Sequence, residues 1–187
     1  MPTPQIAIIE LTVFWLFTWL IAAVWARRVV GRADFGAEFA YRAVIVVGCL
    51  LLYGIRPVGG LRGPFGWAMF GLAVVGFAFC WWARVHLGAL WSANVVRKDD
   101  HHIVDTGPYG LVRHPIYTGL LAATLALAVV DATPQAWLGF AVITIGYVMK
   151  ASLEERFLRQ ELGPEAYDGY RARVPMLIPW KLGLTRG

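Results

Sequence analysis

Charged residues are scarce in this sequence. Only 16% of its 187 residues are Asp, Glu, Lys or Arg, and the acidic residues number just 12. The chain is 58% hydrophobic, and its mean hydropathy is +0.58. An ordinary soluble domain carries about 25% charged residues and about 45–50% apolar ones. The scarcity of charge therefore excludes that class and favours a membrane protein.

Long basic runs and numerous cysteines are also lacking. The net charge is +5, but no five or six basic residues stand together, and the arginines lie at the ends of apolar segments. That distribution is typical of membrane topology and excludes a nucleic-acid partner. The two cysteines, Cys49 and Cys80, lie inside apolar segments, where a thiol behaves as a small hydrophobic group. No disulfide framework is predicted.

Apolar segments are what the sequence has in abundance, and five can be distinguished. They cover residues 6–26, 41–55, 65–83, 116–130 and 134–149. The first is long enough to span a bilayer, and Arg27 and Arg28 follow it in place of a signal-peptide cleavage site. The last two are short, but their three apolar neighbours favour a membrane hairpin. The sequence predicts an all-α, polytopic integral membrane protein with about five transmembrane helices.

The basic residues also predict an orientation. With the N-terminus outside, 15 basic residues lie on the cytoplasmic side, and only Arg56 and Arg62 lie outside. Cytoplasmic loops carry such an excess of Lys and Arg. The polar stretches 84–115 and 150–187 then share the cytoplasmic face. We expect one domain over 1–187, with transmembrane helices in 1–83 and a catalytic region in 84–187 that contains the helical hairpin 116–149.

Ionisable groups from two separate places should meet at one end of this hairpin. His114 precedes Pro115, so it favours an extended backbone, and Pro115 suits the first position of a helix. Unpaired N–H groups at that helix start attract anions. The next helix returns antiparallel and brings Lys150 and Glu154, four residues apart on one face, to the same depth. Arg113, His114 and Tyr117 should therefore approach Lys150 and Glu154, and ionisable groups at a membrane boundary usually mark a site.

Simpler interpretations exist for each part. Lys150 and Glu154 could form an ordinary ion pair at a helix end, and Arg113 could extend toward the membrane surface. The run from Asp99 to His102 contains metal-ligand side chains, but its spacing fits no familiar ligand pattern, so no metal site is predicted. The conjunction of a helix start, a helix end and a polar loop on one face favours a functional site.

The C-terminal half resembles the isoprenylcysteine carboxyl methyltransferase family and its bacterial relatives. The matching text is LGALWSANVV at 87–96, HHIVDTGPYGLVRHPIYTG at 101–119 and EERFLRQELGPEAYDGYRARVPMLIP at 154–179. The resemblance implies an integral membrane methyltransferase that uses S-adenosyl-L-methionine in a cytoplasmic cofactor pocket. The pocket residues that it implies are Arg97, His101, His102, Ile103, Val104, Tyr109, His114, Pro115, Ile116, Tyr117 and Glu154.

The resemblance also implies a catalytic-site cation that holds the acceptor. The family typically has Arg one turn before the matching Glu, whereas this chain has Lys150. A lipophilic small-molecule or lipid acceptor would enter sideways from the membrane lipids, and tyrosine rings could face the sulfonium of the cofactor. Methyl transfer to a carboxylate needs no general base, whereas an amine must first lose its proton.

Several alternatives stay open at this level. The acceptor could be a phospholipid or small-molecule amine instead of a prenylcysteine carboxylate. Membrane sterol-type reductases resemble the same C-terminal region but bind NADPH. The sequence does not indicate the oligomeric state.

Overall fold

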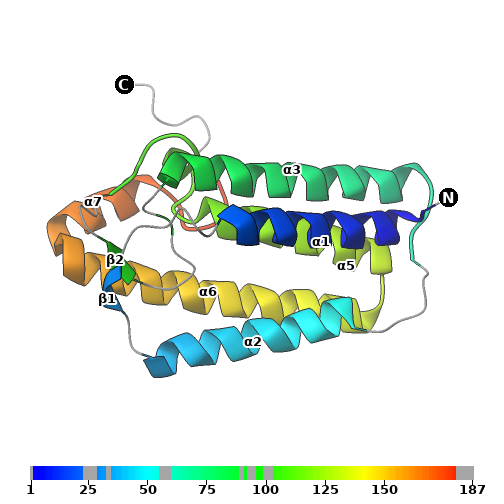
Figure 1. The fold of residues 1–187 in the computed structure, drawn as a ribbon, viewed down its shortest axis with the longest axis horizontal. Coiled ribbons are helices and arrows are strands. Elements are labelled where there is room, and N and C mark those ends of the chain that lie inside the picture. The colour runs from blue at the N-terminus through cyan, green and yellow to red at the C-terminus, as the bar shows by residue number, and fades with distance from the viewer. Residues whose placement is uncertain are drawn as a thin grey trace.

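The computed structural model describes residues 2–22, 29–32, 35–54, 60–88, 91, 96–98 and 103–179. Nearly all of them lie in helices (Figure 1). The elements are α1 (Pro4–Ala22), β1 (Val29–Arg32), α2 (Phe35–Tyr53), α3 (Pro64–Leu87), β2 (Val96–Lys98), α4 (Pro108–Leu111), α5 (Pro115–Asp131), α6 (Pro134–Leu162) and α7 (Pro164–Arg173). Each of these helices except α2 begins at a proline, whose missing N–H costs nothing in the first turn.

The long helices form two layers (Figure 1). In one layer α3 packs along α5, and α1 contacts both of them. In the other layer α2 packs along α6. Contacts between α5 and α6 are the main connection between the layers. The short elements α4, α7, β1 and β2 gather at one end of the helices. Residues of α4 and α7 line the candidate site.

Glycines allow the closest helix approaches. A Cβ atom on Gly119 of α5 would clash with the backbone oxygen of Gly76 and lie 2.6 Å from Cys80 Sγ on α3. A Cβ atom on Gly139 of α6 would lie 2.8 Å from the Leu52 nitrogen on α2. Membrane helices commonly use small residues in this way, because lipid provides little hydrophobic drive for helix association. Each layer therefore contains a helix pair held close by glycine: α3 with α5, and α2 with α6.

The membrane helices agree with the expected fold class. Four are long and apolar enough to cross a membrane: Pro4–Ala22, Gly36–Tyr53, Pro64–Leu87 and Pro134–Leu162. The fifth apolar helix, Pro115–Asp131, has 17 residues, which is at the lower limit for a span. The all-α, polytopic membrane prediction is confirmed.

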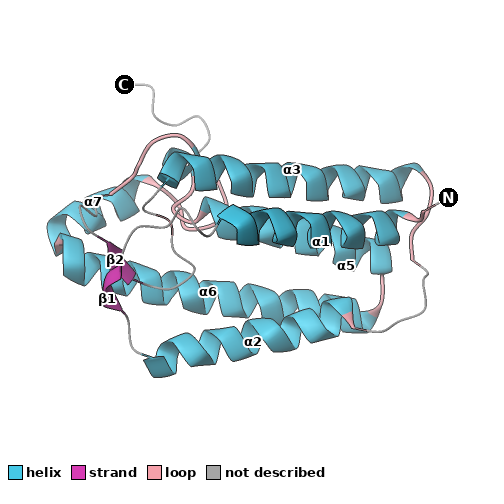
Figure 2. Ribbon diagram, in the orientation of Figure 1, coloured by secondary structure: helices cyan, strands magenta, loops and turns pink. Residues whose placement is uncertain are grey.

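One detail of the predicted elements was wrong, and one pairing of elements was not predicted. The last apolar segment was expected to end at 149, but α6 continues to Leu162, so Lys150 and Glu154 lie inside a 29-residue helix. The helix continues beyond the apolar segment because the Leu, Glu and Arg residues that follow are good helix formers. The sequence also gave no sign that β1 and β2 pair antiparallel, with Val29 opposite Lys98 (Figure 2).

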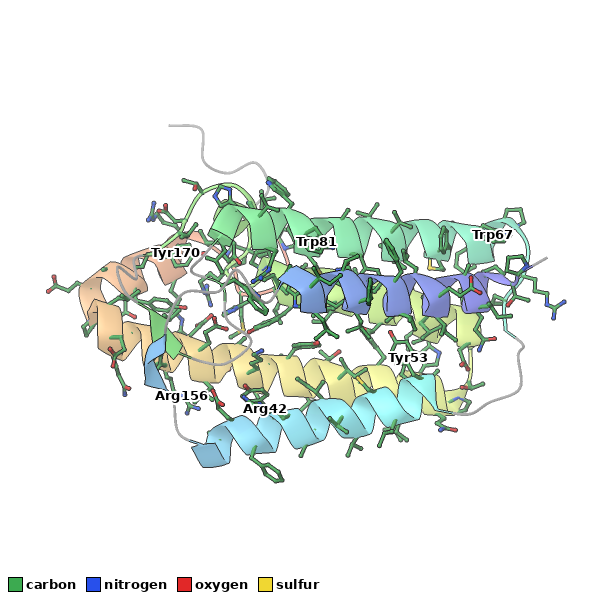
Figure 3. All side chains as sticks on the ribbon, viewed as in Figure 1. Arg42, Tyr53, Trp67, Trp81, Arg156 and Tyr170 are labelled. Carbon is green, nitrogen blue, oxygen red and sulfur yellow. The ribbon has the colours of Figure 1, made fainter. Side chains whose placement is uncertain are left out.

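Aromatic side chains fill much of the interior of the α1–α3–α5 layer. Trp81 of α3 meets Trp19 of α1 edge to face, with ring centroids 5.5 Å apart (Figure 3). Trp15 stacks on Trp19 at 4.6 Å and on Phe77 at 5.0 Å. Such pairs stabilise by about 0.5–1.5 kcal/mol beyond their buried area. They fix α1 against α3 beside the candidate site.

Candidate active site

A cavity of about 690 Å³ is the candidate site. It is lined by residues from α1, α2, α3, α4, α5, α6 and α7, so both layers contribute to it. One part of its lining is polar, with Arg113, His114, Lys150 and Glu154. The rest of the lining is mostly apolar and aromatic. The volume of the whole cavity is typical of a small-molecule site.

Most of the residues predicted for the site line this one cavity. They are Ile103, Val104, Tyr109, His114, Pro115, Ile116, Tyr117, Lys150 and Glu154. The backbone of Arg97 lies in β2, but its side chain is outside the described part of the chain, as are His101 and His102. The structure thus brings together residues about forty positions apart; their role in cofactor binding stays a prediction.

Helix α5 starts at Pro115, as predicted, but the backbone of His114 is not in the extended conformation that was expected. His114 precedes Pro115 with a non-helical backbone, at φ −125° and ψ 64°, and Pro115 occupies the first turn. The rings of His114 and Tyr117 stack at 5.3 Å with an interplanar angle of 5°. One helical turn therefore places an imidazole and a phenol side by side at the cavity.

Tyr117 joins this helix start to Glu154 of α6. The Tyr117 hydroxyl donates to Glu154 Oε2 at 2.8 Å, and His114 Nδ1 lies 3.7 Å from the same oxygen. The Glu154 side chain keeps 33% of its surface exposed. Its other oxygen, Oε1, accepts no hydrogen bond from any described residue, so it is available to a donor group of a ligand.

Glu155 has a different environment. Its side chain is only 6% exposed, and its Oε1 accepts from Arg113 Nε at 2.8 Å and lies 3.1 Å from His114 Nε2. Arg113 also donates through Nη1 to the carbonyl oxygens of Arg171 and Val174. A buried carboxylate is tolerated because charged and hydrogen-bonding partners surround it. Arg113 was expected to approach Lys150 and Glu154. That prediction was wrong, because Arg113 is bound to Glu155 instead.

The segment that follows α7 holds the approach to α5. The backbone N–H groups of Arg113 and His114 donate to the carbonyl oxygens of Pro175 and Met176, at 2.8 and 3.1 Å. The Thr118 hydroxyl donates to the Leu177 carbonyl at 2.7 Å. The amides just before the helix are thus already paired with protein. Only the first turn of α5 itself could serve the anion site that the sequence suggested.

Three buried tyrosines complete the polar end of the cavity. They are Tyr109 of α4 and Tyr167 and Tyr170 of α7, and all three line it. Burial raises the pKa of each phenol above its ordinary value, so the hydroxyls stay protonated. Tyr170 donates to the backbone oxygen of Tyr109 at 2.8 Å and so ties α7 to α4 (Figure 3).

The apolar part of the cavity contains residues that the sequence did not single out. Trp15 and Trp19 of α1, Tyr53 of α2 and Tyr147 of α6 all line it. Tyr147 stacks on Tyr117 at 5.2 Å and so connects the apolar part to the polar part. Tyr147 could have been predicted to line the cavity, because it lies three residues before Lys150 on the same face of the helix. Tryptophans in membrane helices give no such signal, because most of them are packing or interface residues.

Metal ligands do not cluster in the described residues. No three His, Cys, Asp or Glu side chains among them come close enough together to hold an ion. The run from Asp99 to His102 lies outside the residues that the structure describes.

Comparison with known proteins finds a matching family for part of the chain. Residues 69–160 match the model of the isoprenylcysteine carboxyl methyltransferase (ICMT) family. This region of the chain belongs to that family. It contains α4, α5, most of α3 and nearly all of α6, and with them most of the cavity's polar residues.

Individual relatives carry different names. The chain is 32% identical over 87 residues, 46% of its length, to protein-S-isoprenylcysteine O-methyltransferase B of Arabidopsis thaliana, and these cover 44% of the plant protein. It is 45% identical over 74 residues, 39% of its length, to methanethiol S-methyltransferase 1 of Bradyrhizobium diazoefficiens, of which they cover 25%. It is 36% identical over 109 residues, 54% of its length, to the cobalt-zinc-cadmium resistance protein CzcN of Cupriavidus metallidurans, of which they cover 46%. The chain thus spans less than half the length of these curated relatives.

Proposed function

We propose that this protein is an integral membrane methyltransferase that uses S-adenosylmethionine and methylates a lipophilic acceptor at the cytoplasmic face of a membrane. The observation that carries the proposal is the composition of the large cavity among the described residues. An accessible carboxylate, an imidazole and an ammonium group line one part of it, and aromatic rings within the membrane line the other. The polar part suits a water-soluble cofactor, and the aromatic part suits a lipophilic acceptor. Methyl transfer needs the two molecules to lie next to each other.

The residues present fit the cofactor. Glu154 offers a carboxylate oxygen for its hydroxyl or amino groups, and the side chains of His114, Tyr109 and Ile103 would form the neighbouring walls. Tyr117 holds Glu154 in place through its 2.8 Å hydrogen bond. When bound, S-adenosylmethionine supplies an electrophilic methyl carbon for in-line displacement by the acceptor.

The protein then acts mainly by positioning. Fixed tyrosine and histidine rings restrict where an acceptor atom can lie, and the aromatic walls exclude water from it. Alignment of reactants and loss of water around the nucleophile together supply much of the acceleration in such a reaction. A carboxylate or thiolate acceptor would need no base.

The cavity reaches the exposed surface of the apolar helix α1. Val13 and Leu16 of α1 line it although they are 62% and 48% exposed on the protein surface. Cys49 and Tyr53 line it from α2. A lipophilic acceptor would therefore enter between α1 and α2 without leaving the bilayer. The names of the relatives support methyl transfer to a carboxylate or a sulfur atom, and these define the acceptors to be tried first.

The test is methyl transfer by the purified protein in detergent. Methyl-labelled S-adenosylmethionine is supplied with a prenylcysteine carboxylate, a lipophilic thiol or a phospholipid amine, and label in the extracted lipophilic product is counted. We expect transfer to at least one acceptor and loss of transfer in the Glu154→Ala variant. Transfer to none of the three classes, by protein that is folded, contradicts the proposal.

A further inference from the structure

The ammonium group of Lys150 lies near two tyrosine rings that come from different helices. Its Nζ atom is 5.2 Å from the ring centroid of Tyr117 on α5 and 5.5 Å from that of Tyr41 on α2. Both distances are within the range of cation–π attraction, about 6 Å. Tyr117 lines the cavity, whereas Tyr41 is only 2% exposed and is not among its lining residues.

A glycine explains how α2 reaches this point. Gly146 lies one turn before Lys150 on α6, and a Cβ atom there would lie 2.5 Å from Ile45 Cγ1 and 3.4 Å from the Tyr41 carbonyl oxygen. Any side chain at 146 would therefore push α2 away. With glycine, the two helices approach closely, and Tyr41 comes within reach of the lysine.

Arg42 is a second cation near Tyr41, but an ion pair with Glu38 compensates its charge. Arg42 is also near this ring, with its Cζ atom 5.8 Å from the centroid (Figure 3). Arg42 Nη2, however, pairs with Glu38 Oε2 at 2.7 Å, and the Glu38 residue is only 6% exposed. The ion pair compensates the arginine charge, so its repulsion of the Lys150 ammonium is reduced.

We propose that Tyr41 is a positioning residue for Lys150, and that α2 therefore belongs to the acceptor site although it lies outside residues 69–160 that match the family. The inference rests on the proposed function. Lysine carries a point charge on a flexible stem and lacks the planar fork of arginine. Two tyrosine rings that restrict the ammonium group compensate for that flexibility, because a preorganised cation loses less freedom when an anion binds. The group recognised is an anionic group, such as a carboxylate, on an otherwise apolar acceptor.

The experiment compares two acceptors, a prenylcysteine carboxylate and an uncharged lipophilic thiol. KM and kcat are measured for wild type, Tyr41→Phe, which keeps the ring, and Tyr41→Leu, which removes it. Tyr41→Leu should raise KM for the carboxylate about two- to fivefold, leave its kcat within about twofold, and leave KM for the thiol unchanged. Tyr41→Phe should behave like wild type. In a Lys150→Met background Tyr41→Leu should have no further effect, because the two residues act as one unit.

A second series covers the case in which Tyr41→Leu does not fold. Phenylalanines with increasing numbers of fluorine atoms, incorporated at position 41, weaken the ring's attraction for cations at nearly constant size, and KM for the carboxylate should rise with each step. A flat series, or an equal effect on both acceptors, overturns the role of Tyr41 and leaves the proposed function standing. Wild-type protein that does not methylate the carboxylate overturns this inference, and the proposed function stands if another acceptor is methylated. Transfer to none of the three acceptor classes overturns the proposed function and this inference with it.

Discussion

Two adjacent glutamates of α6 illustrate how far residue type alone can mislead. Glu154 is one-third exposed and presents an oxygen to the cavity, whereas Glu155 is buried between Arg113 and His114. The sequence predicted that Glu154 would meet His114 and Tyr117. It assigned no role to Glu155, because how a second, consecutive carboxylate is surrounded depends on the rotation of α6 about its axis.

We predict that Glu154 is needed for cofactor binding. Glu154→Ala should weaken S-adenosylmethionine binding about tenfold to a hundredfold, because loss of a hydrogen bond to a charged group costs about 1.5–3 kcal/mol. Isothermal titration calorimetry gives the comparison. The matched control is Asp168→Asn on α7, which removes the acid from an exposed ion pair with Arg159 of α6. Equal affinities for Glu154→Ala and wild type would remove Glu154 from the cofactor site.

Glu155 should instead determine stability. Glu155→Ala leaves the Arg113 side chain, 7% exposed, without its carboxylate, and breaking such a buried pair costs about 3–5 kcal/mol. Thermal unfolding in detergent should show a much lower midpoint for Glu155→Ala than for Glu154→Ala. If the two variants unfold at the same temperature, the assignment of a structural clamp to Glu155 is wrong.

The helices show which predictions apolarity can support. The order of the five long helices could be predicted, because each contains an apolar segment; the short helices α4 and α7 contain none and were not predicted. The ends of the long helices could not be predicted, because α2 begins at Phe35 and α6 continues to Leu162 through charged residues that pair with neighbouring elements. Pairing between β1 and β2 was not foreseeable either, because it joins two short segments more than sixty residues apart.

Close packing of α3 on α5 predicts that a larger residue at Gly119 lowers the stability of the protein. Gly119→Ala should destabilise the protein by about 1–3 kcal/mol, because its Cβ atom would meet the α3 backbone and Cys80 Sγ. Gly71 on α3 is the control, since nothing lies within 4 Å of a Cβ atom there. Gly71→Ala should be neutral or stabilise by up to about 1 kcal/mol. Unfolding midpoints that move equally in the two variants would contradict the glycine-mediated contact.

At the scale of the whole molecule, the site end and the opposite end of the bundle should face different compartments. Gly60 lies beside Val130, at the end of α5 remote from His114. The distribution of basic residues predicts that this end lies outside and that the site lies in the cytoplasm. Reporter fusions at Gly60 and after Gly187 should therefore report opposite sides. Activity of the same reporter at both positions would contradict the topology.

The central claim is that the cavity between the two helix layers binds S-adenosylmethionine. A thermal-shift comparison of S-adenosylmethionine, S-adenosylhomocysteine and NADPH on the detergent-solubilised protein tests it most directly. At a hundredfold excess over Kd a ligand adds about 2.7 kcal/mol of stability, which corresponds to a rise of about 5 °C or more for a chain of this size. The account predicts that rise with both adenosyl compounds, none with NADPH, and a much smaller one in Glu154→Ala. Stabilisation by NADPH alone would contradict it.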